Sequence, residues 1–166
     1  MRPMDKPTDS RADAADLEPL PPVAKSLPVR LMRARESVMS RIRPVLRAHG
    51  ITEQQWRVLR TIQDLHETEI TALADQVFLL PPSLSRILRD LELRGLLDRR
   101  SSAMDQRRAL VSVTPAGAQL IREVEPALLT VRLEMRALFG IDRLRALDAL
   151  LEELAAALGP GEPEGD

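Results

Sequence analysis

Two short amphipathic helical segments, separated by a tight turn and followed by an alternating stretch, constrain the fold of this chain most strongly. Apolar residues recur at helical spacing over residues 70–76, and again from Pro81 or Pro82 up to Gly95. Residues 78–80 form the turn between these two segments. A short helix, a tight turn and a second helix predict a helix-turn-helix unit. Any helical hairpin can imitate this pattern, so the residues that follow it decide between the alternatives.

The next segment predicts a β-hairpin. Residues 96–100 can form one strand, and residues 101–106 are polar and suit a turn. Residues 109, 111 and 113 are apolar and alternate with their neighbours, as in a strand with one buried face. Thr114 and Pro115 then pair an N-cap residue with a proline at the first helical position, so a long helix begins there. A hairpin directly after the second helix is a wing, and residues 51–114 are predicted to form a winged helix-turn-helix DNA-binding domain.

Helical segments flank this domain on both sides. Residues 26–50 carry an apolar helical stripe with Ser26 as the expected N-cap and Pro44 as an expected kink. Two more helices are expected over residues 115–138, interrupted by Pro126, and over residues 141–158. Because the last helix is rich in leucine and little protein remains to cover it, pairing with a second subunit is expected. The predicted fold is mainly α with a small β-hairpin wing, and the protein is expected to be an obligate dimer through residues 26–50 and 115–158.

The two ends of the chain and its composition limit the possible classes of protein. Residues 1–25 and the acidic residues 159–166 lack periodicity and are expected to be disordered. There is no cysteine, no secretory leader pattern and no apolar run near the ~20 residues that cross a bilayer. With only two histidines and no phosphate-binding or nucleophile motif, we expect no enzyme, no metal and no cofactor. A cytoplasmic protein without membrane contact is expected.

The net charge of −1 hides a segregated distribution. Between residues 26 and 60 there are eight arginines and two glutamates, and between residues 82 and 108 seven arginines and four acids. The last 25 residues hold seven acids and two arginines. Basic segments that coincide with the predicted helix-turn-helix and wing indicate a double-stranded DNA partner.

The stretch from Asp105 to Gly117 resembles the MarR (multiple antibiotic resistance regulator) family of bacterial transcription factors. It fits the family's wing pattern D-x-R-x-x-x-V-x-L-T-x-x-G, with Val113 in place of leucine. The match extends in order over residues 27–158. Residues 33–38, 43–46 and 49–58 also resemble one subgroup, the repressors of homoprotocatechuate-degradation operons and their relatives. The resemblance implies a homodimeric repressor.

The predicted DNA contacts lie on the second helix of the helix-turn-helix and on the wing. The helix presents Ser83, Ser85, Arg86 and Arg89 on the side away from its apolar residues, and Arg86 is the best candidate for a bidentate contact with guanine. On the wing, Arg107 can enter the minor groove, and Arg108 can meet phosphate. The resemblance implies that Asp105 orients Arg107. Solvated arginines and an Asp–Arg pair that only shapes the turn are the alternatives.

The resemblance also implies a crevice for a small aromatic acid. Here the crevice would draw on Arg33, Ser37, His49, Trp56 and Arg57. An arginine matches the fork geometry of a carboxylate, and histidine or serine can reach a ring substituent. His49 can equally be a cap for helix carbonyls, and Trp56 can equally be part of the core.

Together these features predict a ligand-responsive repressor of a pseudo-palindromic operator. The resemblance implies control of aromatic-acid catabolism and release by a small aromatic carboxylate. The alternatives are a winged-helix regulator without a small-molecule effector, and a winged helix used for protein–protein contact.

Overall fold

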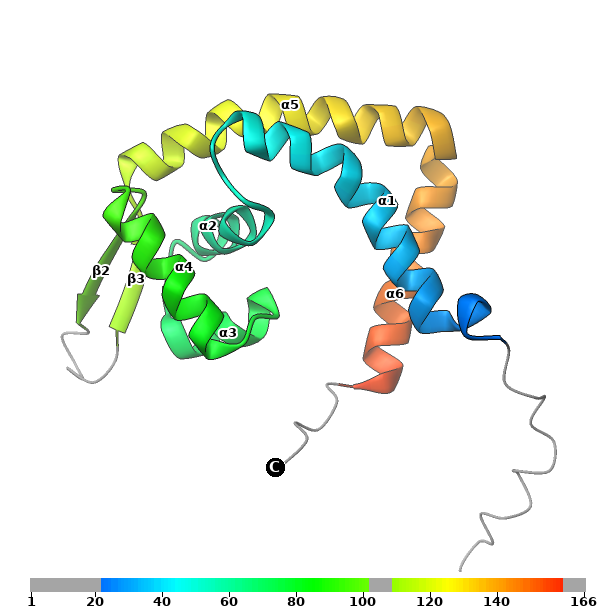
Figure 1. Ribbon diagram of the computed structural model, residues 1–166, viewed down its shortest axis with the longest axis horizontal. Coiled ribbons are helices and arrows are strands. Elements are labelled where there is room, and N and C mark those ends of the chain that lie inside the picture. Colours follow the sequence, from blue (N-terminus) through cyan, green and yellow to red (C-terminus); the bar gives the residue numbers. More distant parts are fainter. Residues whose placement is uncertain (1–21, 102–108, 160–166) are drawn as a thin grey trace, which may run out of the picture. The chain divides into compact units, whose positions relative to one another are not determined.

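Figure 1 shows a computed structural model of the chain, in which residues 22–101 and 109–159 are described. The chain forms two units, residues 1–39 and residues 40–166. In the first unit, the described residues form the 3₁₀ turn η2 (Val23–Lys25) and the beginning of helix α1 (Leu27–Ala48).

Helix α1 begins directly after Ser26, as predicted, and ends at Ala48, within the predicted segment 26–50. The Ser26 hydroxyl donates to the Val23 carbonyl at 2.7 Å. The helix continues through Pro44 without a break. A proline removes one donor, and the remaining hydrogen bonds of a 22-residue helix keep its turns together.

The second unit contains the predicted helix-turn-helix and hairpin, which are confirmed. Its central elements are α2 (Glu53–Leu65), β1 (Glu67–Glu69), α3 (Ile70–Val77), α4 (Pro81–Leu93), β2 (Leu97–Ser101) and β3 (Ala109–Val113). The strands form an antiparallel sheet in the order β1-β3-β2, in which Val111 is opposite both Thr68 and Arg99. Strand β1 was not expected, because three residues with the sequence Glu-Thr-Glu carry no apolar alternation. On β3 the expected alternation is only partial, since Val111 is buried while its neighbours are half-buried.

Local signals in the sequence set the ends of these elements. Thr52 and Gln55 form a complete capping box at the start of α2. The Thr114 hydroxyl accepts from the Gly117 amide at 3.1 Å and starts the next helix. Phe78 ends α3 in the left-handed conformation with φ of 49°, and Gly95 follows α4 with φ of 68°. Two of these signals thus mark the starts of helices, and the other two mark the ends of α3 and α4.

One core holds α2, α3, α4 and the sheet together. Fully or nearly fully buried residues come from all of these elements, from the end of α1 and from the first half of the next helix. They are Leu46, Ile51, Val58, Leu59, Ile62, Leu73, Val77, Leu84, Ile87, Leu88, Leu91, Leu96, Leu97, Val111, Ile121 and Val124. Burial of this aliphatic set stabilises the unit, and a core with few aromatic rings agrees with the composition.

Two long helices complete the second unit, α5 (Pro115–Phe139) and α6 (Ile141–Leu158). The expected interruption at Pro126 is wrong, because α5 continues through it. As at Pro44, a single missing donor is tolerated within a long helix. Helix α6 packs against α5 and has no buried residue of its own. Among the described residues, no helix combines the length and the low polarity that crossing a bilayer requires.

Candidate nucleic-acid interface and pocket

Helix α4 presents one apolar and one polar face. Its apolar face consists of Leu84, Ile87, Leu88 and Leu91, all in the core. Ser83, Ser85, Arg86 and Arg89 are exposed, as predicted from the helical spacing. Neither arginine forms an ion pair with another described residue. Their guanidinium groups are therefore available to an external acceptor on this face, and their role in contacting DNA stays a prediction.

Polar contacts hold α4 against the beginning of α2. The Gln55 side chain donates to the Asp90 carboxylate at 2.6 Å. Arg94 donates to the Gly50 carbonyl at 3.0 Å and lies 3.8 Å from the same carboxylate. Asp90, the acid nearest to the exposed arginines in the sequence of α4, is thus already engaged. These contacts orient α4 at its C-terminal half, while Ser83, Ser85 and Arg86 in its N-terminal half are exposed.

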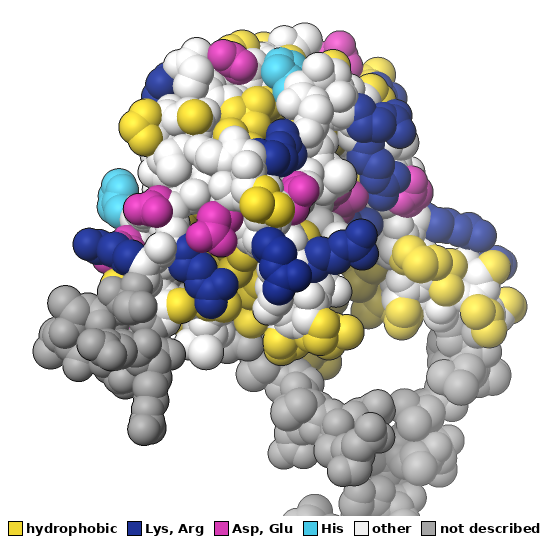
Figure 2. Space-filling model, turned by 60° about the vertical axis from the view of Figure 1, so that its left-hand side comes forward, with side chains coloured by type: hydrophobic (Ala, Val, Ile, Leu, Met, Phe, Trp, Pro, Cys, Tyr) yellow, Lys and Arg dark blue, Asp and Glu magenta, His cyan; other side chains and the backbone are white. Residues whose placement is uncertain are grey.

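The hairpin adds further basic side chains. On β2, Arg100 pairs with Glu67 of β1 at 2.6 Å, and Arg99 is exposed. Asp105, Arg107 and Arg108 lie outside the described residues. Figure 2 brings forward the side of the molecule that is on the left in Figure 1, and Lys and Arg side chains are spread over this face with acidic side chains between them. Arg99 was not among the predicted contacts, although its place at the start of the wing could have marked it.

The predicted effector residues fall into two groups. Arg33 and Ser37 belong to the first unit, where both are exposed on α1 and the Ser37 hydroxyl donates to the Arg33 carbonyl at 3.0 Å. In the second unit, Nδ1 of His49 is 2.9 Å from the Val45 carbonyl. This contact matches the alternative interpretation of His49 as a cap for helix carbonyls.

The Arg57 side chain is bound by other residues of the second unit. Its guanidinium donates to the Val77 carbonyl at 2.9 Å and lies 3.6 Å from the Glu53 carboxylate. Arg43 donates to the other oxygen of that carboxylate at 3.1 Å. The Arg57 side chain thereby links α2 to the end of α3. This structural role does not depend on any contact with a ligand.

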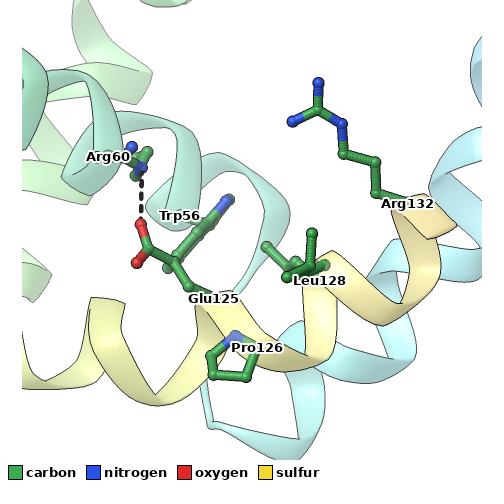
Figure 3. Close-up of a pocket in the computed structure, with 7 residues that line it drawn as sticks. Trp56, Arg60, Glu125, Pro126, Leu128 and Arg132 are labelled. Atoms are coloured by element: carbon green, nitrogen blue, oxygen red, sulfur yellow. Dashed lines mark ion pairs between the residues drawn. The ribbon is translucent and has the colours of Figure 1, made fainter.

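A pocket of about 570 Å³ lies between α2 and α5. It is lined by Trp56, Arg60, Glu125, Pro126, Leu128, Leu129 and Arg132. Figure 3 shows the indole of Trp56 and the side chain of Leu128 between the Arg60–Glu125 ion pair at one end of the pocket and Arg132 at the other. Arg60 pairs with Glu125 at 3.5 Å and with Asp64 at 2.6 Å. The volume and the mixture of apolar and charged lining suit a small amphipathic ligand.

Of the predicted effector residues in the second unit, only Trp56 lines this pocket. Arg60 was missed, although its spacing of four from Trp56 places both on one face of α2. Glu125, Leu128, Leu129 and Arg132 share a face of α5 by the same rule. The spacing could have identified each face separately, but nothing in the sequence pairs residue 56 with residue 128.

The described part of the chain was compared with the requirements of a metal-binding site. There is no group of three or more His, Cys, Asp or Glu side chains placed to hold an ion within residues 22–101 and 109–159.

Comparisons with a family profile, with related sequences and with solved structures agree on one family for this chain. The MarR family profile matches residues 51–109. The homoprotocatechuate degradative operon repressor of Escherichia coli is 34% identical over 131 residues, which cover 79% of this chain and 88% of the relative. The crystal structure of NadR in complex with 4-hydroxyphenylacetate has a TM-score of 0.71 at 33% identity and covers 83% of this chain and 98% of NadR. The repressor CouR bound to a 23-mer DNA duplex has a TM-score of 0.75 at 25% identity, covering 80% of this chain and 94% of CouR. The chain therefore belongs to the MarR family of DNA-binding transcriptional regulators.

Proposed function

We propose that this protein binds a pseudo-palindromic operator as a homodimer and that a small aromatic carboxylate releases it. Residues 51–114 would read the DNA, and residues 26–50 and 115–158 would form the dimer. The observation that carries DNA binding is the exposed face of α4, where Arg86 and Arg89 stand beside two serines without internal ion pairs to described residues. A helix of this kind presents its N-terminal turns to base edges in the major groove.

The pocket between α2 and α5 supports the second part of the proposal. One wall belongs to the helix that packs against α3 and α4, and the other belongs to a helix of the proposed dimerisation region. A ligand that contacts both walls can favour one arrangement of the two regions over another, which is the condition for shifting a conformational equilibrium. Trp56 offers a ring for stacking, and two arginines offer charge to a carboxylate.

Replacing Arg86 by alanine should weaken operator binding by about 5- to 150-fold, the range expected for loss of one good bidentate contact with a base. The operator duplex would be selected from a randomised pool, and affinity would be measured by fluorescence anisotropy at fixed salt. Arg122→Ala is the matched control, because Arg122 is exposed on α5 and its guanidinium donates to the Gln119 side chain of the same helix. If Arg86→Ala and Arg122→Ala bind the operator equally well, the assignment of α4 as the reading helix is wrong.

Titration with 4-hydroxyphenylacetate should lower operator affinity at saturation by about 5- to 150-fold, the usual span of coupling between two sites. Hexanoate, which carries the same charge without a ring, is the control and should leave affinity unchanged. Binding of the acid itself would be followed by thermal shift. Stabilisation of the protein with no change in operator affinity would contradict the proposed release.

A further inference from the structure

The turn between α3 and α4 presents two large apolar side chains to solvent. Phe78 is 86% exposed and Leu80 is 75% exposed, whereas Leu79 between them is half-buried and packs against the core. Leu84, the next leucine along the chain, is already buried. Phe78 and Leu80 therefore contribute little to the core of the second unit, and their contact with water is unfavourable.

The backbone conformation at Phe78 adds a second unfavourable contribution. Phe78 is the C-cap of α3 and has φ of 49° and ψ of 53°, in the left-handed region. Glycine is the residue that ordinarily ends a helix in this conformation, and a bulky side chain there is an outlier. The phenylalanine thus destabilises its own turn at a position where packing offsets little of that effect. A strained and exposed aromatic residue of this kind points to a contact outside the subunit.

The start of α4 is poorly suited to bind a phosphate. A helix N-terminus usually binds anions through its free backbone N–H groups. The first two residues of α4 are Pro81 and Pro82, which carry no N–H, and the N-cap Leu80 forms no side-chain cap hydrogen bond. Because the two exposed apolar side chains come directly before these prolines, this end of the helix is suited to an apolar contact instead.

The position of the turn beside the polar face of α4 indicates which partner covers it. Phe78 and Leu80 directly precede the exposed Ser83, Ser85 and Arg86. In Figure 1 the N-terminal end of α4 and the end of the hairpin where β2 finishes and β3 begins point to the same side of the second unit. A helix that reads the major groove contacts base edges with its N-terminal residues. The group in that groove that matches an apolar side chain is the C5 methyl group of thymine.

We propose that Phe78 and Leu80 contact thymine methyl groups of the operator, and that Phe78 is a specificity-determining residue for thymine. This proposal rests on the proposed reading of DNA by α4 and adds an apolar contact to it. Arg86 would select guanine by hydrogen bonds, whereas Phe78 would select thymine over cytosine, which lacks the methyl group, at a neighbouring base pair.

Replacement of thymine by deoxyuridine tests the contact from the side of the DNA, because it removes the methyl group and leaves base pairing intact. Each thymine of an operator selected from a randomised pool would be replaced in turn, in both half-sites together, and affinity measured by fluorescence anisotropy at fixed salt. At one or more positions, binding of the full-length wild-type protein should weaken by about 4-fold for each methyl group lost, and so by about 15-fold for two half-sites. If every deoxyuridine operator binds as tightly as the thymine operator, the proposal is wrong.

Phe78→Gly tests the contact from the side of the protein. This variant should bind the thymine operator about 10-fold or more weakly than wild type, and the thymine and deoxyuridine operators within about twofold of each other. Its Tm should be equal to that of wild type or higher, because glycine adopts the left-handed conformation without strain. Leu93→Ala is the control: Leu93 is 82% exposed at the other end of α4, and its replacement should change neither operator affinity nor the response to deoxyuridine.

Three results with Phe78→Gly would overturn the proposal. A lower Tm together with weaker binding would show that Phe78 supports the fold. A retained response to deoxyuridine would show that another group contacts the methyl. Operator binding as tight as that of wild type would leave the turn to a partner other than DNA, such as a second protein. Failure of the proposed reading of DNA by α4 has a different signature, in which Arg86→Ala also binds the operator as tightly as wild type.

Discussion

Replacing Gly117 by alanine is expected to lower the free energy of unfolding by about 2–4 kcal/mol, within the range of severe core changes. Gly117 is the third residue of α5 and is buried. A Cβ atom there would lie 2.2 Å from the Leu96 carbonyl oxygen and 2.8 Å from Cγ1 of Val113. The Leu96 carbonyl cannot move away freely, because it accepts the Thr114 amide at 3.1 Å. Alanine normally favours a helix over glycine by about 1 kcal/mol, and here the clash outweighs that gain.

Thermal unfolding followed by circular dichroism should show a fall in Tm of roughly 5–15 °C for this variant at equal protein concentration. Gly50→Ala is the control. At Gly50 the Cβ would meet no atom within 4 Å, and only the positive φ of 66° penalises alanine, at about 1 kcal/mol. A Gly117→Ala protein as stable as the Gly50→Ala protein, or more stable than wild type, would show that α5 and the β2–β3 hairpin do not approach as closely as described.

Features encoded within a few neighbouring residues could be predicted from the sequence. The capping box at Thr52 and the N-cap at Thr114 set the starts of α2 and α5 because each needs only a side chain and the next turn. The exposed face of α4 followed from the 3.6-residue period in the same way. These local signals were sufficient for the helix-turn-helix and the hairpin.

Features that depend on distant segments could not be predicted. Strand β1 exists because β3 supplies its partner, and its own residues give no strand signal. The pocket requires α2 to pack beside the middle of α5, about seventy residues further along the chain. Arg57 and Arg60 are equally basic in the sequence, and only the packing of α2 decides that Arg60 faces the pocket while Arg57 faces Val77.

Replacing Leu150 by glutamate should dissociate the proposed homodimer and weaken operator binding by about 100-fold or more, because an unpaired carboxylate in an apolar interface costs several kcal/mol. Helix α6 has no buried residue, and its leucines remain accessible. The exposed fractions are 42% for Leu147, 62% for Leu150, 40% for Leu151 and 74% for Leu158. Exposing an apolar stripe of this kind to water is unfavourable in free energy. A second copy of the same helix would cover the stripe symmetrically.

The mass in solution, measured by light scattering, reports the dimer directly, and anisotropy reports operator binding. Ala149→Glu is the matched control: it adds the same charge one residue away on α6, outside the leucine stripe, at an exposed position. Since Leu150 is already mostly exposed within one subunit, its replacement should leave the circular dichroism spectrum of the subunit unchanged. A Leu150→Glu protein that remains dimeric and binds the operator as tightly as Ala149→Glu would place the dimer interface elsewhere. Dissociation of Leu150→Glu but not of Ala149→Glu would show that α6 joins the subunits, and an accompanying loss of operator affinity would show that two copies of α4 are needed to hold the operator.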